Sequence, residues 1–280
     1  MARSRGLSVV ALTDHDTVSG VLEALGAGKE AGVRVIPGIE ISVEDHGVHI
    51  LGYGIDIEDP VLLAELEKAR LGRLAGAKQM VENLKAAGFV IEWEEVLTEA
   101  KGPTVARPHI ARAVLSHPEN KEKLGGAATV HDFIDQYLSD TSPYYVGRTH
   151  IRAQAAIALI HGAGGVAVWS HPAIHFRDDV EGLEAFLKEF IRWDLDGMEI
   201  FNPSHTEDET ELLEGLTVQY GILRTAGSDF HEAGEHPAGD RGLRSAGAVG
   251  EYETYGFSLD GIIEKLDEAI EKRKKKIGVA

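Results

Sequence analysis

The sequence predicts an α/β fold whose largely parallel sheet is interrupted by a helical insertion. The first observation is that short apolar runs of strand length alternate with helical segments, which is typical of βα units. The second is that residues 60–149 are rich in helix formers and show no strand alternation. We therefore expect a discontinuous α/β domain at residues 1–59 and 150–280, and a helical insertion domain at residues 60–149.

The segment before the insertion is predicted to begin with a strand and a helix. Residues 8–13 form an apolar run that predicts a buried strand, and residues 20–31 place apolar side chains on one side of a helix. Two further strands are predicted at residues 33–37 and 47–53. These elements set up the first part of the sheet.

The insertion is predicted to contain helices alone, whereas the segment after it contains both strands and helices. Within the insertion, helices are predicted at residues 61–87, 105–115 and 130–138. After it, strands are expected at 166–170, 197–201 and 221–226, and helices at 153–161, 180–191, before 221, and at 258–275. The βα alternation thus resumes and continues to the end of the chain.

Composition narrows the function classes. The chain has 28 basic and 46 acidic residues and a net charge of −18, which argues against a long nucleic acid held by a basic surface. The absence of cysteine excludes disulfides, thiolate metal sites and cysteine nucleophiles. No apolar run is long enough for a membrane span, and the first residues carry no signal-peptide pattern, so we expect a cytoplasmic protein without a membrane partner.

Side chains of the metal-ligand type recur where the predicted strands end. At strand ends they are Asp14, His15, Glu40, His171, Asp229 and His231, and His49 is expected inside the predicted strand at residues 47–53. Taken singly, such a histidine can be a structural residue, Asp14 or Asp229 can cap a helix, and Glu40 can be a solvated loop carboxylate. Because the ends of parallel strands meet at one rim, the joint pattern predicts a multi-metal site for Zn²⁺, Mn²⁺ or Fe.

Other chemistry lacks support in the sequence. No Walker loop, Rossmann fingerprint or nucleophile elbow is present. The remaining histidines do not recur at strand ends, and we interpret them as surface or structural residues: His46, His117, His131, His150, His161, His175 and His236.

Five motifs in order resemble those of the PHP (polymerase and histidinol phosphatase) superfamily. They are Ala11–Thr17, Pro37–Ser42, Val48–Gly54, Ser170–Pro172 and Gly227–His231, and together they extend over nearly the whole chain. Arg107–Arg112 in the insertion and Glu199–His205 resemble the subgroup of nucleoside 3′,5′-bisphosphate phosphatases and short-RNA 5′-exonucleases.

The resemblance implies a distorted (β/α)₇ barrel with up to three divalent metal ions at one rim. It implies metal ligands at His15, Glu40, His49, His171, Asp229 and His231, with His15 and Asp229 also taking part in catalysis. It implies substrate contacts from Arg107, His109 and His205, which without the family would be interpreted as a helix-surface Arg, a helix-start His and a loop His. An arginine suits a phosphate because its planar fork donates two hydrogen bonds.

The chain departs from the family pattern at its beginning. The strand with a His-x-His pair that opens the family is missing from the sequence, so we expect fewer than three metal ions. We expect that the gene start has been placed too late; a natural remnant is the alternative. A barrel lacking this strand exposes two sheet edges, which a homo-oligomer could cover. A smaller departure is Glu232, where the family has glycine.

The expected reaction is hydrolysis of a phosphomonoester in a small phosphorylated nucleotide or a short oligonucleotide. The helical insertion with Arg107 and His109 would hold a second phosphate, which favours a nucleotide with phosphates at both ends. One alternative is a histidinol-phosphate-type phosphatase. Another is a non-catalytic metal- or nucleotide-binding remnant, which would bind without turnover.

Overall fold

The computed structural model describes residues 1–102, 105–139, 141–147, 151–231 and 246–278. Glu232, the departure from the family pattern, lies outside them. The chain divides into two compact units, which are described separately: residues 1–64 with 150–280, and residues 65–149. The first boundary follows Ala64 and lies inside a helix, whereas the sequence predicted it after Asp59. The division into folding domains stays a prediction. None of the helices in the described part combines the length and apolar surface that a membrane span needs.

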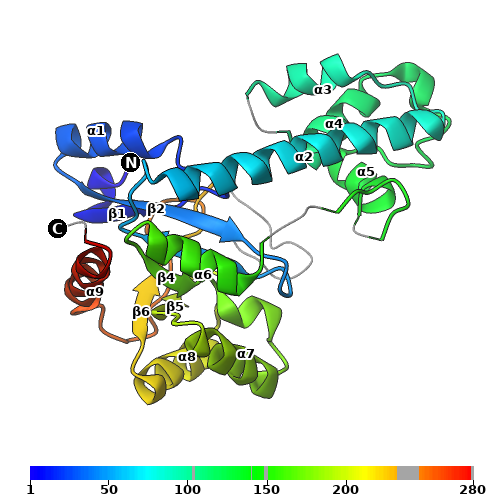
Figure 1. Cartoon of the computed structure of the whole chain (residues 1–280). Helices are drawn as coiled ribbons and strands as arrows, with labels where there is room; N and C mark the ends of the chain where they lie inside the picture. Colours follow the sequence, from blue (N-terminus) through cyan, green and yellow to red (C-terminus); the bar gives the residue numbers. More distant parts are fainter. Residues whose placement is uncertain (103–104, 140, 148–150, 232–245, 279–280) are drawn as a thin grey trace. The chain divides into compact units, whose positions relative to one another are not determined.

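A six-stranded sheet forms the centre of the first unit (Figure 1). Its strands lie in chain order: β1 (Val9–Leu12), β2 (Arg34–Ser42), β3 (His49–Tyr53), β4 (Val166–Trp169), β5 (Gly197–Phe201) and β6 (Leu223–Ala226). The pairs β1–β2, β4–β5 and β5–β6 are parallel. The sheet forms a half-barrel of the α/β class, where the sequence predicted a distorted (β/α)₇ barrel lacking its first strand; one strand direction differs from the prediction.

The strand β3 runs antiparallel to both β2 and β4, which corrects the prediction of a largely parallel sheet. The cause is a tight hairpin. His46 and Gly47 both have positive φ, 52° and 68°, and the Val48 N–H donates to the Asp45 carbonyl over 3.1 Å. Two successive residues with positive φ are what a type I′ turn requires, and such a turn joins antiparallel strands. A parallel crossover needs a dozen or more residues, more than residues 43–48 provide.

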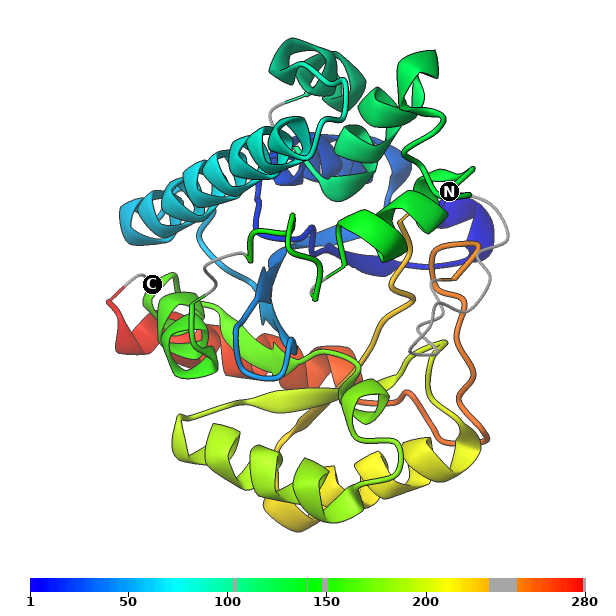
Figure 2. The same ribbon diagram turned by 90° about the vertical axis from the view of Figure 1, so that its right-hand side faces the viewer.

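Helices cover the sheet of the first unit. The helix α1 (Val21–Ala31) packs on β2, α6 (Ala153–Gly162) on β3 and β4, α8 (Glu207–Tyr220) on β5 and β6, and α9 (Ile262–Lys276) on β4 and β6. The helices α7 (Val180–Arg192) and α8 lie side by side in both views (Figures 1 and 2), where the Tyr220 hydroxyl donates to Glu184. The core on the α9 side of the sheet consists of Ile36, Leu51, Tyr53, Val166, Val168, Leu266 and Ile270.

The two edges of the sheet are β1 and β6, and a cavity of about 560 Å³ lies between them. Its walls come from residues 6–15 and 225–231, from apolar residues of α9, and from buried strand residues such as Tyr53. Because the cavity also reaches His15 and Glu40, the open side of the half-barrel is continuous with the rim that carries the metal-type ligands.

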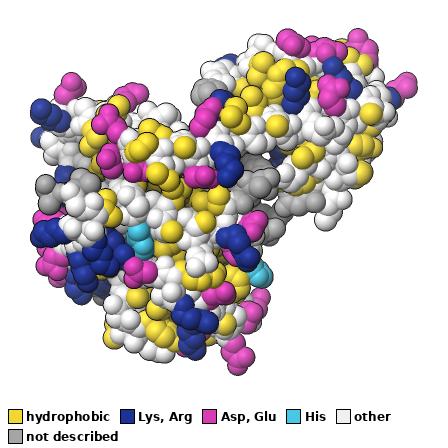
Figure 3. Space-filling view, viewed as in Figure 1, with side chains coloured by type: hydrophobic (Ala, Val, Ile, Leu, Met, Phe, Trp, Pro, Cys, Tyr) yellow, Lys and Arg dark blue, Asp and Glu magenta, His cyan; other side chains and the backbone are white. Residues whose placement is uncertain are grey.

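On the face shown in Figure 3, charged side chains of both signs are interspersed, and Lys and Arg gather over α9. The last turn of α9 holds Arg273, Lys274, Lys275 and Lys276. Arg273 is bound to Asp194 and Asp196, and the lysines alternate with acidic residues earlier in the helix. Basic residues at a helix C-terminus offset its partial negative charge, which accounts for this cluster without a nucleic acid.

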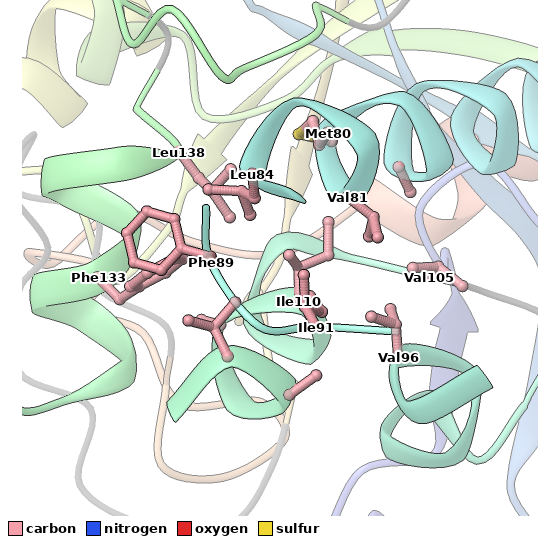
Figure 4. Packing of buried hydrophobic residues seen from close by; sticks show 14 of the residues in the cluster. Met80, Val81, Leu84, Phe89, Ile91, Val96, Val105, Ile110, Phe133 and Leu138 are labelled. Atoms are coloured by element: carbon pink, nitrogen blue, oxygen red, sulfur yellow. The ribbon is translucent and has the colours of Figure 1, made fainter. Parts of the chain in front are cut away.

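The second unit is helical. It contains most of α2 (Pro60–Ala86), followed by α3 (Trp93–Ala100), α4 (Arg107–Leu115) and α5 (Val130–Tyr137). Figure 4 shows its core, in which Leu84, Ile110 and Phe133 are fully buried. The sequence did not predict α3, whose eight residues are too few for a clear period and whose start is capped by Glu92 and Glu95 rather than by Ser or Thr.

Candidate metal centre

The carboxylate of Glu40 lies at the centre of a cluster of imidazoles. Its Oε1 atom is 2.9 Å from Nδ1 of His49 and 3.5 Å from Nε2 of His171, and its Oε2 atom is 3.8 Å from Nδ1 of His15. The rings of His49 and His171 also approach each other, with Nδ1 and Nε2 3.3 Å apart. One buried carboxylate therefore contacts three rings from three different segments.

The strand arrangement explains this convergence. Glu40 lies within β2. His15 follows β1 and forms an isolated parallel bridge with Glu40. His171 comes two residues after the end of β4. His49 is the first residue of β3 rather than an internal one, and the reversed direction of β3 brings its start to the rim where the parallel strands end.

Asp229 and His231 follow β6 and approach the cluster from the other edge of the sheet. The His231 ring lies 5.7 Å from that of His15, measured between centroids, and its Nδ1 atom is 2.9 Å from the Asp229 carbonyl oxygen. Both residues border the same cavity as His15 and Glu40. The structure thus brings together all six residues that the sequence assigned as metal ligands; their role as ligands stays a prediction.

Three non-glycine residues at this cluster have a positive φ. Asp16, His171 and Asp229 have φ values of 53°, 30° and 46°, in the left-handed region that side chains disfavour. Asp16 is held there because its N–H donates to the Glu40 carbonyl and its side chain accepts from Ser42 N–H. Strained residues of this kind gather at functional sites, where the surrounding structure compensates for their cost.

Burial and neighbouring charges shift the proton affinities of the cluster. Burial alone would raise the pKa of Glu40, but close contacts from His171 and His49 hold it well below its usual range. Burial lowers the pKa of His15. The pKa of His171 is raised because contact with Glu40 outweighs burial, and burial raises the pKa of Asp229 with the charge of Glu40 adding to it.

The donor set fits a divalent metal ion. The Nδ1 atoms of His15 and His171 and the Oε1 atom of Glu40 are buried and make no hydrogen bond of good geometry within the described residues. One donor atom from each of His15, Glu40 and His49 lies within 4.8 Å of the others. Buried polar atoms without a hydrogen bond are costly, and a cation bound to imidazole nitrogen and carboxylate oxygen would satisfy them.

A buried carboxylate beside the cluster received no role from the sequence. Glu199 lies on β5 with 3% of its surface exposed and accepts a hydrogen bond from the His171 N–H over 3.0 Å. Burial raises its pKa to about 7. The available signal was a charged residue inside an otherwise apolar strand, residues 197–201, which is rare unless the charge has partners.

The residues predicted to contact the substrate come from both units, and His205 in the first unit lies close enough to His171 for the two charges to interact. His205 follows β5 and is buried. Its Nδ1–H donates a hydrogen bond to the Ile200 carbonyl over 2.7 Å, and its Nε2 atom makes no hydrogen bond of good geometry within the described residues. Arg107 and His109 start α4 in the second unit. Arg107 donates to the Leu138 carbonyl and lies over the Tyr145 ring, and His109 accepts from the Ala106 N–H.

Several of the remaining histidines pair with carboxylates or rings. His117 is 2.9 Å from Glu95, His161 is 2.8 Å from Asp196, and His46 packs edge-on against Phe186. The other two pairs are His131 with Asp135 and His175 with the ring of His171. His150 and His236 lie outside the described residues.

The fold and the ligand cluster define a class of protein. No family model matches the chain. A solved structure from Bifidobacterium adolescentis, described as a metal-dependent phosphoesterase, superposes with a TM-score of 0.73 at 29% identity, covering 96% of this chain and 88% of that one. The half-barrel with histidine and carboxylate side chains at one rim is thus the fold of a metal-dependent phosphoesterase.

Two curated relatives show the family. The chain is 33% identical over 239 residues to a 3′,5′-nucleoside bisphosphate phosphatase from Chromobacterium violaceum, covering 84% of this chain and 80% of the relative. It is 30% identical over 232 residues to a 5′-3′ exoribonuclease from Haemophilus influenzae, covering 82% and 81%. The chain belongs to the PHP family of metal-dependent phosphoesterases, and it is a hydrolase of that family, as its motifs predicted.

Proposed function

We propose that this phosphoesterase hydrolyses a phosphate ester of a nucleotide, either a nucleoside 3′,5′-bisphosphate or the 5′ end of a short RNA. The observation that carries the proposal is the contact of Glu40 with His15, His49 and His171, a donor set suited to metal-assisted hydrolysis. The names of the two relatives supply the substrate class. The acidic net charge agrees with a small substrate rather than a long polyanion.

The metal ligands in this proposal are the six residues at the rim: His15, Glu40, His49, His171, Asp229 and His231. Mn²⁺, Fe²⁺ and Zn²⁺ all suit imidazole and carboxylate ligands. A bound divalent ion lowers the pKa of water and neutralises charge on phosphoryl oxygens. Glu40 contributes the buried negative charge that favours a cation, since its low pKa keeps it ionised at neutral pH.

His15 and Asp229 take the catalytic roles. The lowered pKa of His15 keeps its imidazole neutral, so one ring nitrogen retains a lone pair. Asp229 borders the same cavity as His15, so its carboxylate can accept a proton released from water there. Both residues border the cavity between β1 and β6, where a phosphate ester has access to them.

Substrate contacts come from His205 and from the helical insertion. The guanidinium of Arg107 lies over the Tyr145 ring, and this contact fixes the orientation of the guanidinium plane. Held in this way, its N–H groups would donate two hydrogen bonds to a phosphate. His109 lies two residues further along the first turn of α4. We assign these two residues to a second phosphate of the substrate, and residues 60–149 to the insertion domain that carries them.

The test is phosphate release from adenosine 3′,5′-bisphosphate with added Mn²⁺, beside adenosine 5′-monophosphate and histidinol phosphate. The proposal requires the bisphosphate to be the best substrate and Glu40→Gln to abolish its turnover. If histidinol phosphate is the preferred substrate, the proposed nucleotide reaction is wrong and the chain is a histidinol-phosphate-type phosphatase. Tight nucleotide binding without release of phosphate from any substrate would identify a binding protein.

A further inference from the structure

The carboxylate of Glu199 contacts the loop that carries His171. Its Oε2 atom accepts the His171 N–H over 3.0 Å and the Asn202 side-chain N–H over 2.8 Å. Glu199 is 3% exposed, so these hydrogen bonds are shielded from competing water. The N–H that donates to Oε2 is that of His171, whose φ of 30° is the smallest positive φ in the described residues.

The same carboxylate also packs against the loop that carries Asp229. A Cβ atom placed on Gly227 would lie 1.9 Å from Oε1 of Glu199, so the carboxylate occupies the space that any side chain would need there. The Gly227 N–H donates to the Phe201 carbonyl over 2.9 Å. The register shifts between Glu199 and Phe201, and this bulge lets the end of β5 meet the Gly227 segment.

Asn202 extends the contact to a third segment. Its side-chain oxygen accepts the Ser204 N–H over 2.9 Å, and its carbonyl accepts the His205 N–H over 3.0 Å. Glu199 therefore lies where the ends of β4, β5 and β6 meet. Its Oε2 atom already has two donors, which leaves it poorly suited to ligate a metal or to exchange a proton with a substrate.

We propose that Glu199 is a positioning residue, which holds His171 in its left-handed conformation and sets the spacing between the His171 and Asp229 loops so that both side chains face the metal site. The inference rests on the proposed function, because it takes His171 and Asp229 to be ligands. The physical reason is that a hydrogen bond donated by a backbone N–H to a carboxylate oxygen is directional and strong in a buried site. Residues that orient ligands in this way commonly change metal affinity about 10–100-fold when they are removed.

The test is the affinity of the chain for Mn²⁺, measured by titration calorimetry on the parent and on variants freed of metal. Glu199→Ala should bind Mn²⁺ about 10–100-fold more weakly. Glu199→Gln should recover most of that loss, since its amide oxygen can accept both N–H groups. Glu214→Ala is the matched control. Glu214 is a carboxylate of the same unit, partly buried, that pairs with Arg224, so its loss should lower the melting temperature while leaving the affinity for Mn²⁺ unchanged.

The outcomes separate this inference from the proposed function. A parent chain that binds no Mn²⁺ overturns both. A parent that binds Mn²⁺, with Glu199→Ala binding as tightly, overturns the positioning role alone. Equal losses in Glu199→Ala and Glu214→Ala also overturn it, because the effect would then follow stability. If Glu199→Ala does not fold, Glu199→Asp withdraws the carboxylate by one methylene, and parent-like affinity in that variant contradicts the inference.

Discussion

The Nδ1 atom of His49 lies 2.9 Å from Oε1 of Glu40, although the two residues are not opposite each other in the sheet. The residue opposite His49 is Ser42, and Glu40 lies two positions away on the same face of β2. Diagonal neighbours on one face are close enough for long side chains to touch. A slip of one residue in this register would move Glu40 to the other face and separate the pair.

The first prediction concerns that pair. Glu40→Gln keeps the size of the side chain but removes the buried negative charge among three imidazoles, so the affinity for Mn²⁺ should fall at least about 10-fold. Titration calorimetry measures the loss. Glu44→Gln is the control, because Glu44 lies on the same hairpin and pairs with Arg152 at the surface. Equal affinity in Glu40→Gln and the parent would remove Glu40 from the metal site.

The second prediction tests the insertion. Arg107→Ala should lower kcat/KM for adenosine 3′,5′-bisphosphate by about 10–100-fold, the effect of losing a hydrogen bond of roughly 1.5–3 kcal/mol to a charged group. Steady-state kinetics on the bisphosphate and the monophosphate check it, with the monophosphate little affected.

Arg112→Ala is the matched control for Arg107, because Arg112 lies on the same helix and pairs with Glu99. It should leave both substrates unchanged. Unchanged cleavage of the bisphosphate by Arg107→Ala would exclude Arg107 from substrate binding.

The sequence predicted the six strands of the sheet and the grouping of the candidate ligands, because both depend on local signals. Strands such as Val166–Trp169 are short apolar runs next to turn residues, and His171 follows at once. The motif residues after β1, β4 and β6 meet at one rim because these strands point the same way, whereas His49 reaches the rim from the start of the reversed strand β3. These signals required no knowledge of long-range packing.

The direction of β3 and the role of Glu199 escaped prediction for different reasons. The direction depends on the backbone at His46 and Gly47, and His is a less common choice than Asn or Asp for the first position of such a turn. Glu199 accepts hydrogen bonds from the backbone N–H of His171 and from the side chain of Asn202, and a backbone N–H carries no sequence signal. Contacts of this type become visible once the strand ends are placed.

A third prediction concerns pH. Burial lowers the pKa of His205 from 6.5 to about 4. Between those values the unfolded chain binds one more proton than the folded chain, so the free energy of unfolding falls as the pH drops from about 6.5 to about 4. The full effect is roughly 3 kcal/mol. Urea unfolding of metal-free protein at several pH values measures it.

His205→Asn isolates this contribution. Asn keeps a donor for the Ile200 carbonyl but does not titrate, so the difference in stability between parent and variant should change with pH in that window. Parallel curves for the two proteins would show that His205 is protonated equally in both states. The other titrating groups cancel in the comparison.

The last prediction concerns the space beside Glu199. Gly227→Ala places a methyl group 1.9 Å from Oε1 of Glu199, so the carboxylate or the loop must move, and we expect a loss of about 1–3 kcal/mol in the free energy of unfolding. Gly215→Ala, in α8 where a new Cβ meets nothing within 4 Å, is the control and should stabilise the protein by roughly 0.5–1 kcal/mol. In a Glu199→Ala background the methyl group of Gly227→Ala has room, so its cost should shrink, with a coupling of about 0.5–3 kcal/mol in a double-mutant cycle. The same cost in both backgrounds would mean that Gly227 is required for a reason other than contact with Glu199.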